Sequence, residues 1–366
     1  MKKIVSLLCL SCLLISCSAS KNISNSKVKI TFLDDYIIPE DLEIKNTRVG
    51  GLSGIDFYND TYYIICDHPS NPRFYTASIF INKNKLDTVI ISNVVKLDRT
   101  NETLKNNTMD MEAIRFHTSR NNFLITSEGS ISNGKDPGIY EITKEGKYLS
   151  HYSLPDYFKA AGTQKPRNNG VFEGLSISYN NSGFWSGMEL PLVEDGPKPK
   201  LFPTRSYIRI TEFKDATKEA EFQFAMKLGG IKKIPWKYFA VNGLTELLEY
   251  APKQFIVLER AFSAGHGSNG NTVRLFDVNA NKATNTLTYN NLRKEDIRLA
   301  EKQLIFDFKS IKKQLKEQII DNIEGMTFGP DLPNGNKSLL LISDNNFNSM
   351  GKQISQLILL EVEFKK

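Results

Sequence analysis

The chain has 366 residues, of which 40% are hydrophobic and 24% are charged. This composition is that of a globular protein with a sizeable core, and it excludes wholesale disorder. The formal net charge of +6 at pH 7 is too mild to indicate a nucleic-acid-binding protein, so we expect no nucleic-acid partner.

The first residues predict a lipoprotein signal. Two lysines precede an apolar stretch, Ile4 to Ile15, which is shorter than the about 20 residues of a membrane-spanning helix. The stretch runs into Leu-Ile-Ser-Cys at 14–17, which resembles a bacterial lipobox. We therefore predict a signal peptide at 1–16, a lipid on Cys17 and a tether at 17–27. An ordinary secretory signal, in which Cys17 is incidental, is the alternative.

A lipid anchor would place the protein in the cell envelope. Several acyl chains together hold a protein firmly, whereas a single chain binds weakly and reversibly. The tether lacks an acidic run of the kind that directs some lipoproteins to the cell surface, so we favour the outer membrane, facing the periplasm. We expect the anchor to be the only membrane contact and the protein to be a monomer. After processing, Cys66 is the only thiol, which excludes an internal disulfide and a zinc site built on cysteine pairs.

The body of the chain, 28–366, contains a repeat. Five times, an apolar run that begins near a small polar or acidic residue is followed by a second apolar run that ends on a carboxylate. The pairs are Ser53 with Asp67, Glu112 with Glu128, Glu173 with Glu189, Glu246 with Glu259, and Glu324 with Asp344. Successive pairs are 59, 61, 73 and 78 residues apart. Periods of this length, filled by short strands, are typical of β-propeller blades.

Strand patterns follow the same plan in each repeat. The second repeat, for example, has apolar runs at 113–116, 123–126, 138–142 and 148–154. The stretch 200–242 is longer than one blade needs and contains strand-like runs at 206–211 and 221–226. We therefore predict an all-β propeller with five recognisable repeats and leave five or six blades open.

One segment breaks the β pattern. From 293 to 321, apolar residues recur at helical intervals among lysines and glutamates, which predicts an amphipathic helical insertion. We expect it to pack against the propeller, with a helix that binds a partner or a membrane surface as the alternative.

Several blocks resemble the phytase-like family, described as esterase-like activity of phytase. The blocks are 169–176 (NGVFEGLS), 186–196 (SGMELPLVEDG), 243–246 (GLTE), 257–263 (VLERAFS), 322–330 (NIEGMTFGP) and 339–347 (LLLISDNNF). The resemblance runs from about Val49 to the C-terminus. It implies a secreted or lipid-anchored propeller that hydrolyses esters or phosphoesters.

The common hydrolase motifs are missing. Ser53 follows Gly51, but Ile55 stands where the second glycine of G-x-S-x-G is needed. The four histidines include no pair at i and i+4, which excludes a helical zinc motif, and the sequence predicts no Ser-His-Asp triad.

The paired carboxylates are the strongest candidates for a site. If strand alternation places them at one mouth of the channel, a positive group must balance them, because an unpaired buried carboxylate is costly. We predict Ca²⁺ as the cofactor, with basic side chains such as Arg260, Arg73 and Arg115 as the alternative. The predicted metal ligands are Glu112, Glu173, Glu246 and Glu324; the predicted substrate contacts are Arg260, Asn345, Glu189 and Glu259; the predicted catalytic residues are Glu173, Glu324, Arg260 and His266.

Two hypotheses about function remain. The first is a Ca²⁺-assisted hydrolase of a small anionic or ester substrate, in which one carboxylate is the general base. The second is a non-catalytic propeller that binds a glycan, a peptide or an envelope partner. In both, the carboxylates can instead be architectural and accept backbone N–H groups from the next blade.

Overall fold

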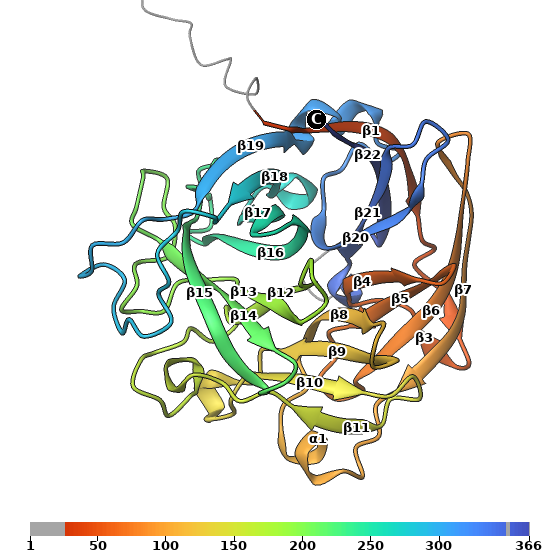
Figure 1. Cartoon of the computed structure of the whole chain (residues 1–366). Coiled ribbons are helices and arrows are strands. Elements are labelled where there is room, and N and C mark those ends of the chain that lie inside the picture. The colour runs from red at the N-terminus through yellow and green to blue at the C-terminus, as the bar shows by residue number, and fades with distance from the viewer. Residues whose placement is uncertain (1–25, 349–351, 366) are drawn as a thin grey trace, which may run out of the picture.

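The computed structural model describes residues 26–348 and 352–365. Five four-stranded antiparallel sheets surround a central axis, and the first strand of each repeat lies innermost (Figure 1). The inner strands β4, β8, β12, β16 and β20 pack in a closed circle, because β20 contacts β4. The protein is therefore a five-bladed β-propeller.

The blades take their strands in chain order, except for the last. Blade 1 has β4 (Leu52–Tyr58), β5 (Thr61–Cys66), β6 (Arg73–Asn82) and β7 (Lys85–Lys96); blade 2 has β8 (Met111–His117), β9 (Asn122–Ser127), β10 (Gly138–Ile142) and β11 (Tyr148–His151); blade 3 has β12 (Phe172–Ile177), β13 (Gly183–Met188), β14 (Tyr207–Lys214) and β15 (Glu219–Lys227); blade 4 has β16 (Ala240–Ala251), β17 (Gln254–Ser263), β18 (Asn271–Asn279) and β19 (Glu301–Asp307); blade 5 has β20 (Asn322–Asp331), β21 (Lys337–Asp344), β22 (Gln356–Phe364) and β1 (Val28–Ile37). Outside the blades lie β2 (Glu43–Ile44), β3 (Thr47–Arg48), α1 (Glu102–Asn106) and 3₁₀ turns η1 (Ile131–Asn133), η2 (Asp156–Phe158), η3 (Gly267–Asn269), η4 (Phe308–Ser310), η5 (Lys312–Gln314) and η6 (Asn346–Asn348).

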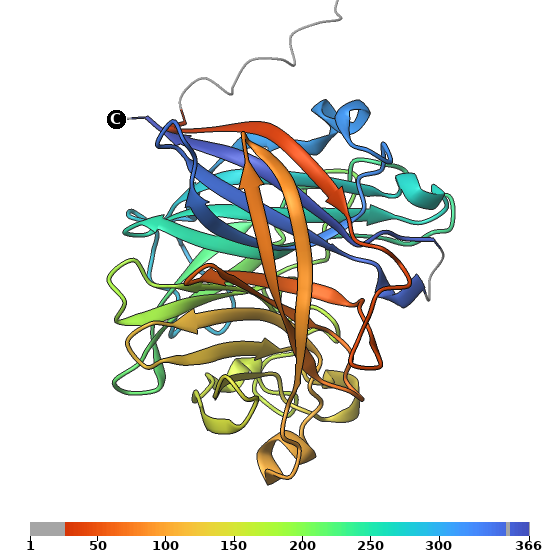
Figure 2. The same cartoon turned by 90° about the vertical axis from the view of Figure 1, so that its right-hand side faces the viewer.

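The N-terminal strand closes the ring. β1 pairs antiparallel with β22, from Val28 opposite Phe364 to Ile37 opposite Gln356, so backbone hydrogen bonds join the two ends of the chain in one blade. The inner strands begin at one face of the disc, which we call the mouth face. β1 begins at the opposite face, beside the C-terminus (Figure 2).

Local sequence explains the hairpins and the core. The β4–β5 turn is Asn59-Asp60 and the β6–β7 turn is Lys83-Asn84, and all four residues have positive φ. Two consecutive residues of this conformation form the type I′ turn that matches the twist of paired strands. Apolar side chains from both faces of each sheet fill the space between blades. For example, the ring centroid of Trp185 in β13 lies 5.2 Å from that of Phe255 in β17.

The predicted helix at 293–321 is wrong. This segment contains β19 and the 3₁₀ turns η4 and η5. β19 pairs with β18 and supplies the fourth strand of blade 4, while Ile305, Phe308 and Leu315 are buried between blades 4 and 5. Hydrogen bonding at the sheet edge therefore decides the conformation, and the helical spacing of the apolar residues reflects successive tight turns.

The stretch 200–242 forms no extra blade. It contains β14 and β15, the two outer strands of blade 3. In the part of the chain that the structure describes, no helix is long and apolar enough to cross a membrane. The predicted signal peptide, Cys17 and the tether as far as residue 25 lie outside the described residues.

Candidate active site at the channel mouth

A break in strand register at the mouth face aims the candidate residues at the axis. In every blade the pairing of the first two strands shifts near the start of the inner strand. Such a bulge re-aims the extra side chain. The bulge residues are Ser53, Glu112, Glu173, Thr245 and Glu324, and the equivalent positions at the end of the second strand are Asp67, Glu128, Glu189, Arg260 and Asp344.

The predicted pair in blade 4 is therefore displaced by one residue. Leu244 pairs with Glu259, and the register shifts before Glu246, so Thr245 and Arg260 occupy the positions that we assigned to Glu246 and Glu259. A hydrogen bond supports this alignment: Thr245 Oγ1 donates to Ile323 O at 3.4 Å, as Ser53 Oγ donates to Met111 O at 2.8 Å in blade 1. Because side chains alternate along a strand, one residue of displacement changes the face on which a side chain lies.

Glu246 points to the inside of the ring below the mouth and forms an ion pair. Its Oε2 lies 2.6 Å from Nη2 of Arg115, and its Oε1 accepts the backbone N–H groups of Leu175 and Leu247 at 2.9 Å. The Arg115 guanidinium also donates to Ile55 O at 2.7 Å and to Met326 O at 2.9 Å. These contacts reach the inner strands of all five blades, so the pair crosses the axis and forms a floor to the mouth.

Glu259 is also fully engaged. Its carboxylate forms an ion pair with Lys302 and accepts hydrogen bonds from Gly229 N–H and from the Asn242 side chain, both at 3.1 Å. Asn345, another predicted substrate contact, accepts the N–H groups of Gly51 at 3.2 Å and Phe347 at 3.1 Å through its Oδ1. Both side chains therefore hold loops in place.

Eight carboxylates remain at the mouth. We call them the acid ring: Asp67, Asp110, Glu112, Glu128, Glu173, Glu189, Glu324 and Asp344. Asp110 was not among the predicted residues. Its sequence signal was the spacing Asp110-Met111-Glu112 at the start of a strand, because residues i and i+2 share a face.

Among the described residues, Arg260 is the cation that forms ion pairs with members of this ring. Its Nη2 is 3.2 Å from Glu324 and 3.8 Å from Glu189. Its Nε is buried and has no hydrogen-bond partner. One guanidinium cannot neutralise eight carboxylates, so the ring is left with an excess of acidic groups.

The pKa values of carboxyl groups in the ring are raised. Burial first, and neighbouring carboxylates such as Glu189 second, raise the pKa of Glu128 to about 8. Burial likewise raises the pKa of Glu324 to about 8 and that of Asp110 to about 7. The pKa of Glu173 also lies well above its usual value, through burial and then the charges of its acidic neighbours. In water-poor surroundings the charged form loses hydration, and like charges add to that cost.

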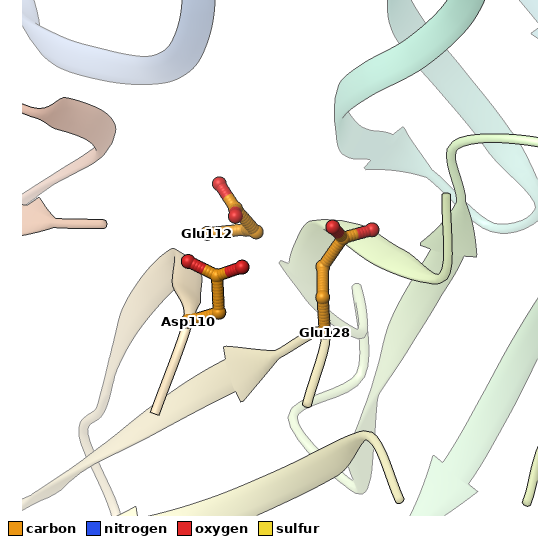
Figure 3. A group of neighbouring side chains, drawn as sticks. All are labelled: Asp110, Glu112 and Glu128. Atoms are coloured by element: carbon orange, nitrogen blue, oxygen red, sulfur yellow. The ribbon is translucent and has the colours of Figure 1, made fainter. Parts of the chain in front are cut away.

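Two groups of three carboxylates share Glu128 and fit a metal ion. One carboxylate oxygen from each of Asp110, Glu112 and Glu128 lies within 4.8 Å of the others (Figure 3), and the same holds for Glu128, Glu173 and Glu189. Oxygens bound to one Ca²⁺ at about 2.3–2.6 Å are at most about 5 Å apart, and carboxylates are ligands that Ca²⁺ prefers.

An unpartnered oxygen of Glu128 is a second observation that favours a cation site. Its Oε1 accepts Val171 N–H at 2.6 Å, whereas its buried Oε2 has no hydrogen-bond partner. Buried polar atoms are rarely left without a partner. The acid ring therefore offers a free acceptor where a cation would complete the coordination.

His266 lies outside the acid ring, on the loop between β17 and β18. Its Nε2 is 2.8 Å from Ile234 O, and its ring centroid lies 4.7 Å from that of Trp236. A Ser-His-Asp group does occur on the face opposite the mouth. There, His117 Nε2 lies 2.6 Å from Asp215 Oδ2, and His117 Nδ1 lies 3.2 Å from Ser119 Oγ. Ser119 and His117 share one turn and Tyr152 also donates to Asp215, so this group links blades 2 and 3.

Fold and site together define a five-bladed β-propeller with a carboxylate-lined channel mouth. A family model for phytase-like proteins, described as esterase-like activity of phytase, matches residues 47–347. The chain therefore belongs to the phytase-like family, as the sequence blocks predicted.

Other comparisons are distant. No curated protein matches the chain. Among solved structures, exo-β-1,3-galactanase of Clostridium thermocellum has a TM-score of 0.47 at 9% identity, over 89% of this chain and 62% of that one. A glycosyl hydrolase from Bacteroides ovatus has a TM-score of 0.45 at 8% identity, over 85% and 83%. Xylan β-1,4-xylosidase from Bacillus halodurans has a TM-score of 0.41 at 11% identity, and this chain spans 54% of its length.

Proposed function

We propose that this protein is a hydrolase of phosphoesters or other small esters, assisted by Ca²⁺ in the acid ring. The observation that carries the proposal is Glu128, which belongs to both carboxylate triplets and keeps one buried oxygen without a partner. Membership of a family described by esterase-like activity supports the reaction class. Fold alone does not, since one fold hosts many functions.

Different residues of the site have different proposed roles. Glu128 would hold the cation together with either Asp110 and Glu112 or Glu173 and Glu189, and the cation would supply charge for an anionic substrate and acidity for a bound water. This set replaces the predicted ligand Glu246, whose oxygens are occupied. Arg260, whose guanidinium lies beside Glu324 and Glu189, would bind a substrate oxygen.

Glu324 is the proposed proton-transfer group. It lies beside Arg260 and outside both triplets, and its pKa is raised to about 8 by burial. A group whose pKa is close to the working pH is best suited to general acid–base catalysis. His266 has no role in this scheme, because it contacts Ile234 and Trp236.

The cellular setting is part of the proposal. We infer a lipid anchor on Cys17 and a monomer at the outer membrane, facing the periplasm. The support is the lipobox-like sequence at 14–17.

Hydrolysis of p-nitrophenyl phosphate and p-nitrophenyl acetate, with Ca²⁺ or with EDTA, tests the proposal. We expect Ca²⁺-dependent turnover that falls about a hundredfold in Arg260→Met, as when an electrostatic donor to a developing charge is removed. Glu128→Gln should lose the dependence on Ca²⁺.

Glu249→Gln is the matched control. Glu249 lies on the same inner strand as Glu246 but accepts N–H groups from Tyr179, Lys253 and Trp185, far along the strand from the bulge. It should keep wild-type turnover. Ca²⁺ binding without turnover of either substrate would reject the hydrolase and leave the non-catalytic binding propeller.

A further inference from the structure

Two loops at the mouth face expose large apolar side chains. The loop between β13 and β14 exposes Leu201 and Phe202, and the loop between β15 and β16 exposes Ile234, Trp236, Tyr238 and Phe239. Phe202 is 61% exposed, Trp236 72% and Tyr238 100%. A folded protein buries most such side chains, and a group of them on one surface marks an interaction site.

The same loops carry an excess of basic residues. Lys198, Lys200, Arg205, Lys232 and Lys237 are exposed, and neither 196–206 nor 228–239 contains an acidic residue. We call these five residues and the six apolar ones the basic–aromatic rim.

The rim is one surface that the fold holds in place. Ile231 N–H donates to Lys200 O at 2.9 Å, which joins the two loops. Trp236 N–H donates to Ala264 O and Ala264 N–H to Phe239 O, both at 2.9 Å, which fixes the second loop to the β17–β18 connection. The Trp236 ring also packs on His266. The apolar side chains are therefore held outward.

The rim adjoins the acid ring. The charge of Lys198 opposes the rise in the pKa of Glu189 that burial causes. Gly229, at the base of the second loop, donates to Glu259, which precedes Arg260 in β17. Whatever covers the rim therefore faces the channel mouth.

The chemistry of the rim selects among partners. Protein–protein interfaces are depleted in lysine, whereas four of the five basic rim residues are lysines. Single-stranded nucleic acids stack on aromatic rings but gain little from protruding Ile and Leu side chains. Trp and Tyr beside Lys, with aliphatic side chains that can enter the acyl region, are typical of protein surfaces that lie on anionic membranes.

We propose that the basic–aromatic rim docks on an anionic lipid bilayer, with the channel mouth toward the headgroups. This adds a membrane contact to the lipid anchor that the sequence predicts. The two are compatible: ten residues from 18 to 27 reach at most about 36 Å, and β1, which runs from the opposite face toward the mouth face, is about 33 Å long.

The fluorescence of Trp236 can report contact of the rim with lipid. It has two tryptophans; Trp185 is buried between blades 3 and 4, and Trp236 is on the rim. The full chain is bound to vesicles of phosphatidylcholine alone or with 30% phosphatidylglycerol, and Trp emission and quenching by brominated acyl chains are recorded. Because only Trp236 can reach the lipid, the readout holds whether or not Cys17 carries an acyl group.

We expect a blue shift and quenching with the anionic vesicles, little of either with phosphatidylcholine, and loss of the signal in Trp236→Phe. Lys232→Glu with Lys237→Glu should require about tenfold more anionic lipid for half-maximal quenching. Phe80→Ala with Ile90→Ala, which removes exposed apolar side chains from β6 and β7, is the control and should leave quenching unchanged.

Three results would overturn the proposal. The first is equal quenching on both vesicle types. The second is a charge-reversal variant that behaves like the wild type. The third is a Trp236 that is shielded without vesicles while sedimentation shows a dimer, because the rim then binds a second copy of the chain.

Discussion

Buried acidic residues have different partners at the floor and at the mouth of the central channel. At the floor, Glu246 meets the Arg115 guanidinium and two backbone N–H groups. At the mouth, Arg260 lies beside Glu324 and Glu189, which are two of eight carboxylates. The floor is balanced by groups that the fold supplies. The mouth is left with an excess of acid that a bound cation would balance.

This difference separates architecture from function. A buried ion pair with every oxygen satisfied joins blades and needs no ligand. A buried carboxylate without a partner raises the free energy of the folded state unless it takes a proton or a metal ion. We therefore expect the floor to stabilise the fold and the mouth to bind a ligand. Variants at each place test these two expectations.

The largest expected effect is at the floor. Arg115→Leu leaves Glu246 buried without its cation and should lower the free energy of unfolding by about 3–5 kcal/mol. Denaturant unfolding measures the change. Arg115→Leu with Glu246→Leu removes both charges and should recover part of that loss; a double variant no more stable than the single one would contradict the account of the floor as an ion pair.

The second effect is stabilisation by Ca²⁺ at the mouth. A ligand that binds only the folded state at a hundred times its Kd should stabilise it by about 2.7 kcal/mol, which thermal unfolding with Ca²⁺ and with EDTA detects. Glu128→Gln should abolish the shift, because Glu128 belongs to both triplets. Glu249→Gln should keep the full shift. If the wild type itself shows none, the carboxylates are balanced internally.

The third effect is a pH dependence in EDTA. Burial raises the pKa of Glu128 and Glu324 to about 8, so the folded protein keeps protons that the unfolded chain loses above about pH 4.5. The folded state then binds more protons than the unfolded state, and stability falls as pH rises from about 5 to about 8. We expect Tm to fall by about 3 °C more in the wild type than in Glu128→Gln. A Tm difference that does not change with pH would show that the raised pKa is absent.

Several elements of the fold were predictable because they depend on local pattern. Apolar runs and turn residues such as Asn59-Asp60 predict the strands, and the repeat of carboxylates predicts the blades and the family. The helix at 293–321 was predicted wrongly, because apolar residues at intervals of three and four occur in successive turns as well as in a helix. Blade 4 needed a fourth strand, and this requirement lies outside the segment.

The candidate site was predicted in outline and misplaced in one blade. Seven of the eight carboxylates in the acid ring belong to the repeat seen in the sequence, but Glu246 and Glu259 were assigned to it by similarity of spacing. The bulge before Glu246 replaces them with Thr245 and Arg260. The basic–aromatic rim was missed for a similar reason, since its two short segments lie about thirty residues apart and become one surface only through the bond from Ile231 to Lys200.

The sequence by itself determined that this chain repeats a strand motif with acidic ends, because alternation and turn chemistry act over a few residues. Tertiary structure alone decided which of those acids lie at the mouth, because the bulge in blade 4 puts Thr245 and Arg260 there in place of Glu246 and Glu259. It also decided which acids find a partner, because Arg115 meets Glu246 only when blades 2 and 4 are brought to the same axis.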